Sequence, residues 1–294
     1  MVYLKIKKES LEPPLYVLPS VAFLLLMMVY PLIYLTDLSF RKALLLRPPM
    51  PYIGLDNFRA VISSDQFLNS LYNTFTWTAG SLVLTGILGL AAALLFNEKF
   101  KGCGFFRVIV LLPWIFPYVA AAIMWRFLLT HPFGHFHAWL ETAGLIGGAE
   151  GALGSSETAI IFAIIVNAWK HFPFIMLMLL SGLQGIPQDL YDAAKVDGAG
   201  YFQQLRYVIL PMLRPILFVS LLIFIIWSIN AFSIVYLLTG GGPGDATEII
   251  TLLIYRLSFI GFDFGVASAL SIILFGIGFI FSVVYAYRMR EVLK

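Results

Sequence analysis

The sequence predicts an all-α integral membrane protein with six transmembrane helices. Its 294 residues are 60% hydrophobic and only 12% charged, and the mean hydropathy is +0.90. The apolar residues gather in six segments of 22 to 26 residues each, and roughly 20 residues suffice to cross a bilayer as a helix. These segments cover about residues 15–38, 71–96, 108–129, 158–182, 214–238 and 266–287. We therefore expect a single transmembrane domain over residues 1–294.

The first apolar segment is expected to stay in the protein as a helix, because it is too long for the core of a cleaved signal peptide and no small-residue cleavage site follows it. The one cysteine, Cys103, excludes a disulfide within the chain. The net charge of +3 is small and no basic run is dense, so nucleic acid is not expected as a partner. The lipid bilayer is the expected surrounding of the chain.

The lysines and arginines between the apolar segments predict the orientation. With the N-terminus inside, the four cytoplasmic segments hold twelve of these residues, and the outer segments hold five. Cytoplasmic loops carry the excess of Lys and Arg in membrane proteins. Both termini are therefore expected in the cytoplasm, together with the polar loop at 183–213.

That polar loop is the longest polar, helix-like segment of the chain. Gly198 and Gly200 divide it into two short amphipathic helices, and Pro211 is expected to end the second one. In the first helix the apolar positions are Leu190, Ala193, Ala194 and Val196, and in the second they are Phe202, Leu205, Val208 and Ile209. Two helices joined by a glycine bend form a protrusion that another protein can grip.

The residues of this loop resemble the cytoplasmic signature of the permease subunits of binding-protein-dependent ABC importers. That signature reads Glu-Ala-Ala, three residues, Gly, nine residues, Ile, one residue, Leu-Pro. The chain keeps every spacing and departs twice, with Asp for Glu and Val for Ile. Asp is one methylene shorter, which affects how deeply it reaches a partner. The matching residues are Asp192, Ala193, Ala194, Gly198, Val208, Leu210 and Pro211.

The resemblance implies the type I ABC importer permease fold and a set of partners. A second, homologous permease subunit, a dimer of ATP-binding cassette ATPases and an extracytoplasmic solute-binding protein would complete the importer. The loop would dock on the ATPase, with Asp192 near the contact, Ala193 and Ala194 allowing close packing, and Gly198 making the bend. ATP and magnesium would be bound by the ATPase, so no cofactor is expected in this chain.

Further segments are similar to the carbohydrate-uptake branch of this family, which includes maltose-type and glycerol-phosphate-type inner-membrane permeases. The similarity implies transport of a sugar or oligosaccharide across the bacterial cytoplasmic (inner) membrane by alternating access. A non-sugar solute such as a polyol phosphate is the alternative, since closely similar permeases serve both. The segments are PYIGLDNFRAVI at 51–62, LYNTF at 71–75, NEKFKGCGFFRVIVLLPWIFPYVAAAIMWRFLL at 97–129, WKHFPF at 169–174 and TGGGPGDATE at 239–248.

A nucleotide site is not expected in the chain itself. No Gly-Lys-Ser or Gly-Lys-Thr occurs, so the usual phosphate-binding loop is missing from the sequence. The glycines from Gly240 to Gly244 fall on the outer side by the charge count and indicate a turn. The energy for transport must then come from another subunit.

Polar residues in the fourth and fifth apolar segments are candidates for a substrate path, since polar groups at membrane depth are costly and usually functional. Asn167, Lys170, His171 and Phe174 are spaced to share one helical face. Trp227, Asn230, Ser233 and Tyr236 form a slanted stripe at a similar depth. Amide, hydroxyl and aromatic groups suit a sugar, whereas hydrogen bonding that only holds helices together is the alternative. The candidate path residues are Asn230, Ser233, Tyr236, Trp227, Asn167, Trp169 and Lys170.

His131, His135, His137 and Glu141 are the one cluster that could bind a metal. Their spacings beside Pro132 and Gly134 do not fix a single ligand face. We therefore expect a solvated outer loop and no metal site.

Two other classes of function remain as alternatives. An integral membrane enzyme acting on lipid would need ionisable residues that meet near a membrane face, and the histidines lack a matched base or nucleophile. A secondary transporter would use an ion gradient, but spans two to six lack buried carboxylates for proton coupling. Neither an enzyme nor a secondary transporter is therefore preferred.

Overall fold

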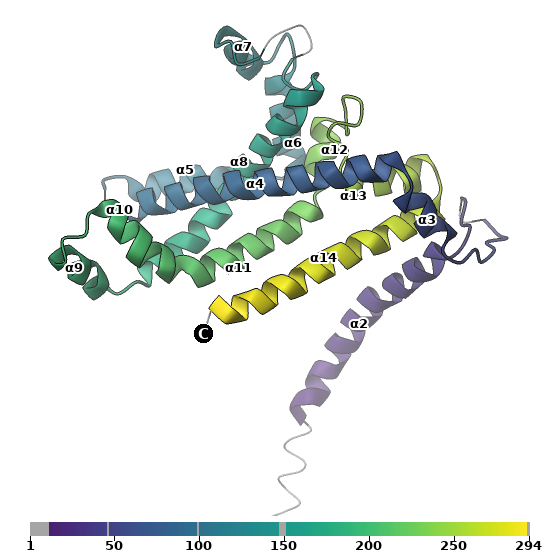
Figure 1. The fold of residues 1–294 in the computed structure, drawn as a ribbon, viewed down its shortest axis with the longest axis horizontal. Helices are drawn as coiled ribbons and strands as arrows, with labels where there is room; N and C mark the ends of the chain where they lie inside the picture. The colour runs from purple at the N-terminus through teal and green to yellow at the C-terminus, as the bar shows by residue number, and fades with distance from the viewer. Residues whose placement is uncertain (1–11, 46, 99, 147–150, 293–294) are drawn as a thin grey trace, which may run out of the picture. The chain divides into compact units, whose positions relative to one another are not determined.

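The structure, a computed structural model, describes residues 12–45, 47–98, 100–146 and 151–292 (Figure 1). In these ranges the regular elements are helices, accompanied by two isolated β-bridges. The chain divides into two compact units. One comprises Met1–Ser63 with Ile254–Ile273, and the other comprises Ser64–Leu253 with Leu274–Lys294.

The first unit contains α2 (Glu12–Ser39), which overlaps the first predicted span, and the short α3 (Asp56–Ile62). The amide of Asn57 donates hydrogen bonds to the carbonyl oxygens of Ser39 and Arg41, at 2.8 and 2.9 Å. Gly265 lies against the same strand-like segment, where an added Cβ would be 2.4 Å from the carbonyl oxygen of Arg41. The loop after α2 is thus fixed by buried backbone contacts.

The centre of the second unit is the pair α4 (Asp65–Asn97) and α8 (Ser156–Gln184). Ser64 caps α4 through a hydrogen bond from the Phe67 amide to its hydroxyl, and Ser155 accepts similarly at the start of α8. A row of small buried residues with a spacing of four faces the interior from α4, which lets helices approach closely in a membrane. The row consists of Ser81, Thr85, Gly89 and Ala93.

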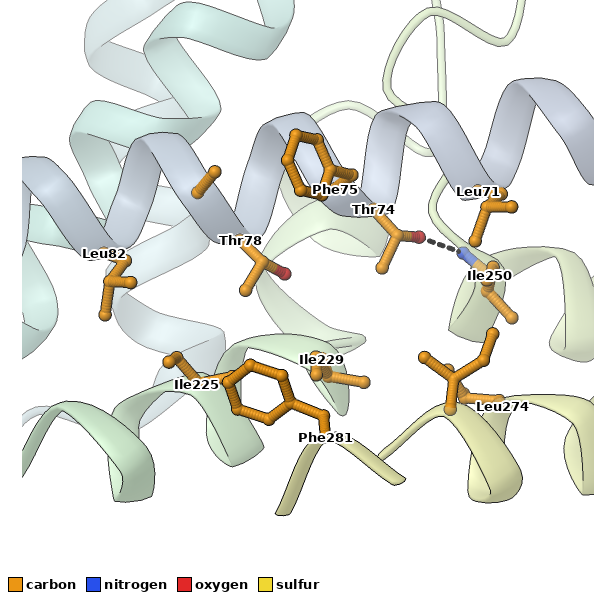
Figure 2. A pocket seen from close by; sticks show the side chains of 12 residues that line it. Leu71, Thr74, Phe75, Thr78, Leu82, Ile225, Ile229, Ile250, Leu274 and Phe281 are labelled. Atoms are coloured by element: carbon orange, nitrogen blue, oxygen red, sulfur yellow. Dashed lines mark hydrogen bonds between the residues drawn. The ribbon is translucent and has the colours of Figure 1, made fainter. Parts of the chain in front are cut away.

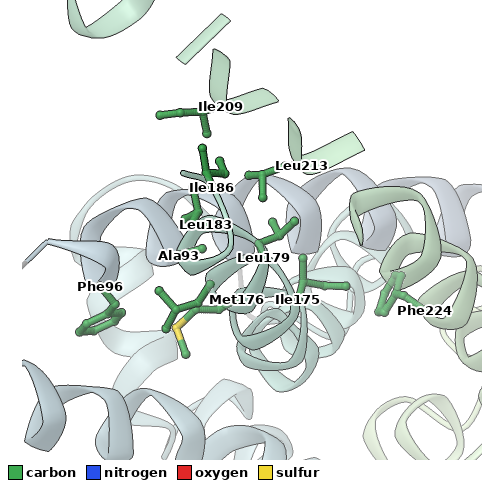
Figure 3. Packing of buried hydrophobic residues seen from close by; sticks show 11 residues of the cluster. Ala93, Phe96, Ile175, Met176, Leu179, Leu183, Ile186, Ile209, Leu213 and Phe224 are labelled. Atoms are coloured by element: carbon green, nitrogen blue, oxygen red, sulfur yellow. The ribbon is translucent and has the colours of Figure 1, made fainter. Parts of the chain in front are cut away.

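A hydrophobic core joins α4 and α8 to the helix that follows the polar loop. Figure 3 shows Met176, Leu179 and Leu183 of α8 beside Ala93 of α4, with Leu213 close by. These residues are buried, with at most a few per cent of each exposed. The polar loop is therefore attached to a closely packed hydrophobic core.

The third predicted span, 108–129, is not one straight helix. It consists of α5 (Cys103–Ile115) and α6 (Tyr118–Leu129), which are bent by 95° relative to each other. The break falls at Phe116 because the residue before a proline is driven out of the helical region, and Phe116 has φ −59° and ψ 141° ahead of Pro117.

The fifth predicted span, 214–238, also differs from the expectation. A continuous helical run begins earlier, with α10 (Tyr201–Gln204), the π-helical turn η1 (Leu205–Ile209) and α11 (Leu210–Ile229). It stops at Asn230, whose side-chain amide donates to the carbonyl of Ile226 at 2.8 Å. The helix resumes as α12 (Ser233–Leu238).

The remaining helices are α7 (His135–Thr142), α9 (Gln188–Val196), α13 (Ile250–Tyr255), the π-helical η2 (Arg256–Ile260) and α14 (Phe264–Val292). Among the described residues, five helices are long and apolar enough to cross a membrane, and the bent pair α5 and α6 can form a sixth span. The all-α membrane fold is therefore confirmed, whereas the cytoplasmic orientation of the termini and the single domain stay predictions.

Candidate functional site

A polar cavity of about 270 Å³ lies inside the second unit, where α6, α8 and the break between α11 and α12 meet. Four of the predicted path residues line it: Asn167, Trp227, Asn230 and Ser233. The two asparagines come from different spans, and their similar depth in the sequence predicted such a meeting. The break after Ile229 presents Asn230 to the cavity instead of hiding it in a helix.

A chain of hydrogen bonds fixes the polar wall of this cavity. Nδ1 of His171 lies 2.8 Å from the backbone carbonyl oxygen of Asn167, so this nitrogen donates. Nε2 of His171 lies 3.0 Å from the hydroxyl oxygen of Tyr118. These two contacts orient the His171 ring, and Tyr118 and His171 lie together in the cavity lining. The amide nitrogen of Asn167 is buried without a hydrogen-bond partner among the described residues.

Lys170 does not line the cavity. Its ammonium donates hydrogen bonds to the carbonyl oxygens of Pro113 (3.1 Å), Trp114 (3.4 Å) and Phe116 (2.5 Å) at the end of α5. It also lies 4.5 Å from the ring centroid of Tyr118. The last carbonyls of a helix lack partners within the helix, and a cation is favourable there. Lys170 thus stabilises the break between α5 and α6.

Two other predicted path residues also lie outside the cavity lining. Trp169 makes an edge contact with Trp125, with ring centroids 5.4 Å apart. Tyr236 stacks on Phe232, with centroids 5.0 Å apart and an interplanar angle of 15°. Phe232 itself lines the cavity, so Tyr236 contacts the lining without being part of it.

Tyr118 and Phe232 are cavity residues that the sequence did not single out. Each follows a break in a helix, Tyr118 after Pro117 and Phe232 after Asn230. The signals were present, because a proline and an asparagine inside apolar segments mark possible breaks. His171 was placed on the right helical face but was not chosen as a path residue.

A second cavity, of about 260 Å³, is apolar (Figure 2). Leu71, Phe75 and Leu82 of α4 line one side, and Ile225 and Ile229 of α11 line another. Two threonines of α4 line it: the hydroxyl of Thr74 accepts a hydrogen bond from the backbone amide of Ile250, drawn as the dashed line in Figure 2, and the hydroxyl of Thr78 is buried without a partner among the described residues. The other ten lining residues are aliphatic or aromatic, so this cavity suits a sugar less well than the polar cavity does.

The predicted protrusion is present as α9, a bend and α10. Gly198 has φ +77°, the left-handed conformation that favours glycine. Gly200 has φ −70° and ψ 171°, which any residue adopts. The bend therefore depends on Gly198 alone.

The expectation that Pro211 ends the second helix is wrong. Helix continues from Tyr201 to Ile229, with the π-helical turn η1 directly before α11. The amide of Leu210 bonds to the carbonyl of Leu205, five residues back. Pro211, which has no amide hydrogen, stands where bonding returns to the ordinary α pattern. The wider turn makes room for the proline ring.

The two faces of the protrusion differ from the predicted ones. Tyr191, Leu205 and Ile209 pack against the core. Val196 and Phe202, which were predicted among the apolar positions of the two amphipathic helices, are 87% and 81% exposed. Of the predicted docking residues, Asp192 and Ala193 are exposed and Ala194 is half-buried. The carboxylate of Asp192 lies 3.6 Å from the ammonium nitrogen of Lys195. The protrusion thus presents apolar and charged groups outward.

The histidine cluster also differs from a solvated loop. His135 is exposed, but His137 is buried on α7 and lies beside His131 and Glu141. The sequence spacing did not predict this cluster, because His131 lies in the loop before α7. Only His137 and Glu141 share a helical face.

Comparison with known proteins identifies the relatives of this chain. The family of the binding-protein-dependent transport system inner membrane component matches residues 85–293. The trehalose/maltose transport system permease protein MalF of Thermococcus litoralis is 38% identical over 92% of this chain and 91% of its own length. The sulfoquinovosyl glycerol transport system permease protein SmoG of Agrobacterium fabrum is 32% identical over 96% of this chain and 91% of its own length.

A solved structure agrees with these sequences. One chain in the crystal structure of a bacterial ABC transporter involved in the import of the acidic polysaccharide alginate has a TM-score of 0.84 and 26% identity, covering 100% of this chain and 99% of that one. The helices, their breaks and the sequence matches point to one conclusion. The chain belongs to the family of inner membrane components of binding-protein-dependent transport systems, and it is a multi-pass membrane protein.

Proposed function

We propose that this chain is the permease subunit of an ATP-driven, binding-protein-dependent sugar importer. The family membership and the sugar-transport relatives support this function. ATP and magnesium would bind to a separate ATPase, since the sequence lacks the usual phosphate-binding loop. The chain would then catalyse no reaction itself and would depend on partners for energy.

The observation that carries the proposal is one helical run that connects the bend at Gly198 with the polar cavity at Asn230. It begins at Tyr201, directly after the exposed bend at Gly198, and it ends at Ile229, beside Asn230 in the polar cavity. A helix rises about 1.5 Å per residue and transmits displacement along its axis. Movement of the bend by an ATPase would therefore act directly on the cavity.

The docking surface on the ATPase side would be the outward face of the protrusion. Val196 and Phe202 supply exposed apolar area, which marks interaction sites on proteins. Asp192 adds charge, and Ala193 and Ala194 allow close approach. Gly198 fixes the angle between the two short helices, while Leu210 and Pro211 lie where the run enters α11.

The cavity chemistry favours a neutral saccharide. Asn230 and Ser233 offer hydrogen bonds to sugar hydroxyls, and Trp227 and Phe232 offer rings for the C–H face of a sugar. Lysine and arginine are missing from the lining among the described residues, and Lys170 is engaged at the end of α5. A polyol phosphate would need a cationic partner, so the sugar is preferred.

A second permease would complete the cavity. Its volume of about 270 Å³ lies just below the range of roughly 300–1,000 Å³ that is usual for ligand sites. A homologous subunit that closes over Asn230 would enlarge and enclose it. An extracytoplasmic binding protein would deliver the sugar, and ATP binding would switch the cavity between its inward-facing and outward-facing states.

The test is reconstitution of the chain with its co-purified ATPase, second permease and binding protein in lipid vesicles. We expect ATP-dependent uptake of a disaccharide such as trehalose or maltose, and no uptake when any one partner is left out. Uptake of glycerol phosphate in preference to saccharides would overturn the substrate assignment. Uptake by the chain alone, driven by an ion gradient, would overturn the function.

A further inference from the structure

The residues around α7 form a polar cluster that the transport function does not use. His131 lies in the short loop after α6, and His137 and Glu141 lie one turn apart on α7. His137 is 1% exposed, whereas the side chain of Glu141 is 52% exposed. The cluster is thus closed on the protein side and open on the carboxylate side.

The three side chains converge on one point. Nδ1 of His131 lies 2.9 Å from Nε2 of His137, and this same Nε2 lies 3.8 Å from a carboxylate oxygen of Glu141. One ligand atom from each residue falls within 4.8 Å of the others. In a tetrahedral zinc site with bonds of about 2.0 Å, ligand atoms are about 3.3 Å apart. The two measured distances fall on either side of that separation.

The local backbone holds the two rings in place. Gly151 covers them, since an added Cβ there would lie 3.0 Å from Cβ of His131 and 3.6 Å from Cε1 of His137. At Gly134, which precedes α7, an added Cβ would lie 2.2 Å from the carbonyl oxygen of Leu128. Both positions require glycine, so the approach of the two histidines is built into the fold.

The contact between the two rings engages one nitrogen of each, Nδ1 of His131 and Nε2 of His137, and a single proton is shared between them. In the tautomers that carry the proton on the other ring nitrogen, both of these nitrogens present a lone pair to the space between the rings. A cation between the rings would accept a lone pair from each, and the carboxylate would supply the third ligand and a negative charge. Two nitrogens and one carboxylate oxygen suit zinc and its neighbours rather than calcium or magnesium.

We propose that His131, His137 and Glu141 bind a zinc-like divalent cation, with water in the fourth position. Small rotations of the two rings and of the exposed Glu141 side chain would bring the three ligand atoms to bonding distance. The cation would connect α7 with the loop that follows α6. Helix α7 has only eight residues. A helix this short is marginal by itself, so the cation would hold it in place.

The experiment uses the full chain in lipid nanodiscs, carried on an affinity tag without histidine. Zn²⁺ binding is titrated by calorimetry after treatment with chelator, and Co²⁺ absorption then reports the ligand geometry. We expect one Zn²⁺ per chain and a tetrahedral Co²⁺ spectrum. His131→Ala and Glu141→Gln should each weaken Zn²⁺ binding by more than about tenfold, since even partners outside the ligand shell cost 10- to 100-fold.

His135→Ala is the matched control, because His135 lies on the same short helix, is exposed, and is outside the cluster. It should bind Zn²⁺ as the parent does. Thermal unfolding separates ligand loss from misfolding: Zn²⁺ should raise the midpoint of the parent and of His135→Ala but not of the two ligand variants. Unchanged Zn²⁺ affinity in His131→Ala and Glu141→Gln, or no stoichiometric binding by the parent, would show only a histidine–histidine hydrogen bond and overturn the proposal.

Discussion

Lys170 of α8 donates a hydrogen bond to the carbonyl oxygen of Pro113 in α5, 3.1 Å away. The same ammonium reaches the carbonyl oxygens of Trp114 and Phe116. A charged side chain that sequence reasoning assigned to the substrate path is therefore the cap of a broken helix. Substitution of Lys170 should therefore change the stability of the chain more directly than it changes sugar transport.

Lys170→Met is expected to destabilise the chain, because it keeps most of the side-chain volume and leaves the carbonyls at the end of α5 without their donor. An unsatisfied buried acceptor costs about 1–3 kcal/mol, so the midpoint of thermal unfolding should fall. Lys195→Met, which removes an exposed lysine from α9, is the control and should change little. Equal midpoints for the two variants would contradict the capping role of Lys170.

Gly198→Ala is expected to disturb coupling through backbone strain alone. The residue has φ +77°, and an added Cβ there meets no atom within 4 Å, so the cost is that of the left-handed conformation, about 1–2 kcal/mol. ATP hydrolysis that depends on the sugar should decrease in the reconstituted importer. Gly200→Ala is the control, because its φ of −70° needs no glycine. Similar losses in both variants would show that the bend does not depend on Gly198.

Val196→Asp combined with Phe202→Asp should weaken association with the ATPase. Both side chains are mostly exposed, so folding should be unaffected. Removal of one buried apolar side chain from an interface costs about 1.5–3 kcal/mol, which is at least a tenfold loss of affinity. Gln203→Asp adds charge on the same turn without removing apolar area and should retain the ATPase. Co-purification followed by quantitative immunoblotting measures the difference.

Asn230→Ala is expected to raise the KM for sugar uptake. The loss of a hydrogen bond of about 0.5–1.5 kcal/mol corresponds to roughly a twofold to tenfold weaker interaction. Trp169→Phe is the control, since Trp169 contacts Trp125 and does not line the cavity. A larger effect from Trp169→Phe than from Asn230→Ala would place the sugar elsewhere.

Tyr191→Phe should change how stability depends on pH. Burial, with a smaller contribution from Glu98, raises the pKa of the Tyr191 hydroxyl. The unfolded chain releases this proton near pH 10 while the folded chain still holds it. As far as this group is concerned, the free energy of unfolding is therefore constant below about pH 10 and falls as the pH rises further.

The variant should accordingly lose less stability than the parent as the pH rises above about 10, which unfolding midpoints measured on both sides of that pH will show. At neutral pH it should be at least as stable, because the hydroxyl is buried without a partner among the described residues. A steeper alkaline loss in Tyr191→Phe would contradict the assignment.

The sequence predicted the positions of the helices better than their interruptions. Apolar length is a strong signal, and each predicted span overlaps a helix or a helix pair. The break at Phe116 precedes Pro117 and the π-helical turn precedes Pro211, but a proline alone does not decide whether a helix breaks or continues, since Pro113 and Pro173 lie inside helices. Lys170 stabilises the break after α5, and a residue 54 positions away along the chain cannot be paired with Phe116 by local pattern.

The candidate cavity was predicted in part for a related reason. Helical spacing brought Asn167 and Asn230 to similar depths, and both line the cavity. Spacing could not show which residues of each helical face point into the cavity. Trp169 and Tyr236 were therefore predicted as path residues, although each packs against a neighbouring aromatic ring outside the lining. Tyr118 was missed because its position depends on the bend after Pro117. His137 was misjudged because its partner His131 lies outside the helix.

The close approach of α4 and α8 at Gly89 has a consequence for the membrane as a barrier. A Cβ added to Gly89 would lie 2.7 Å from Ile175, so neither a file of water molecules nor an acyl tail fits at that contact. Ions and protons thus find no path through this contact.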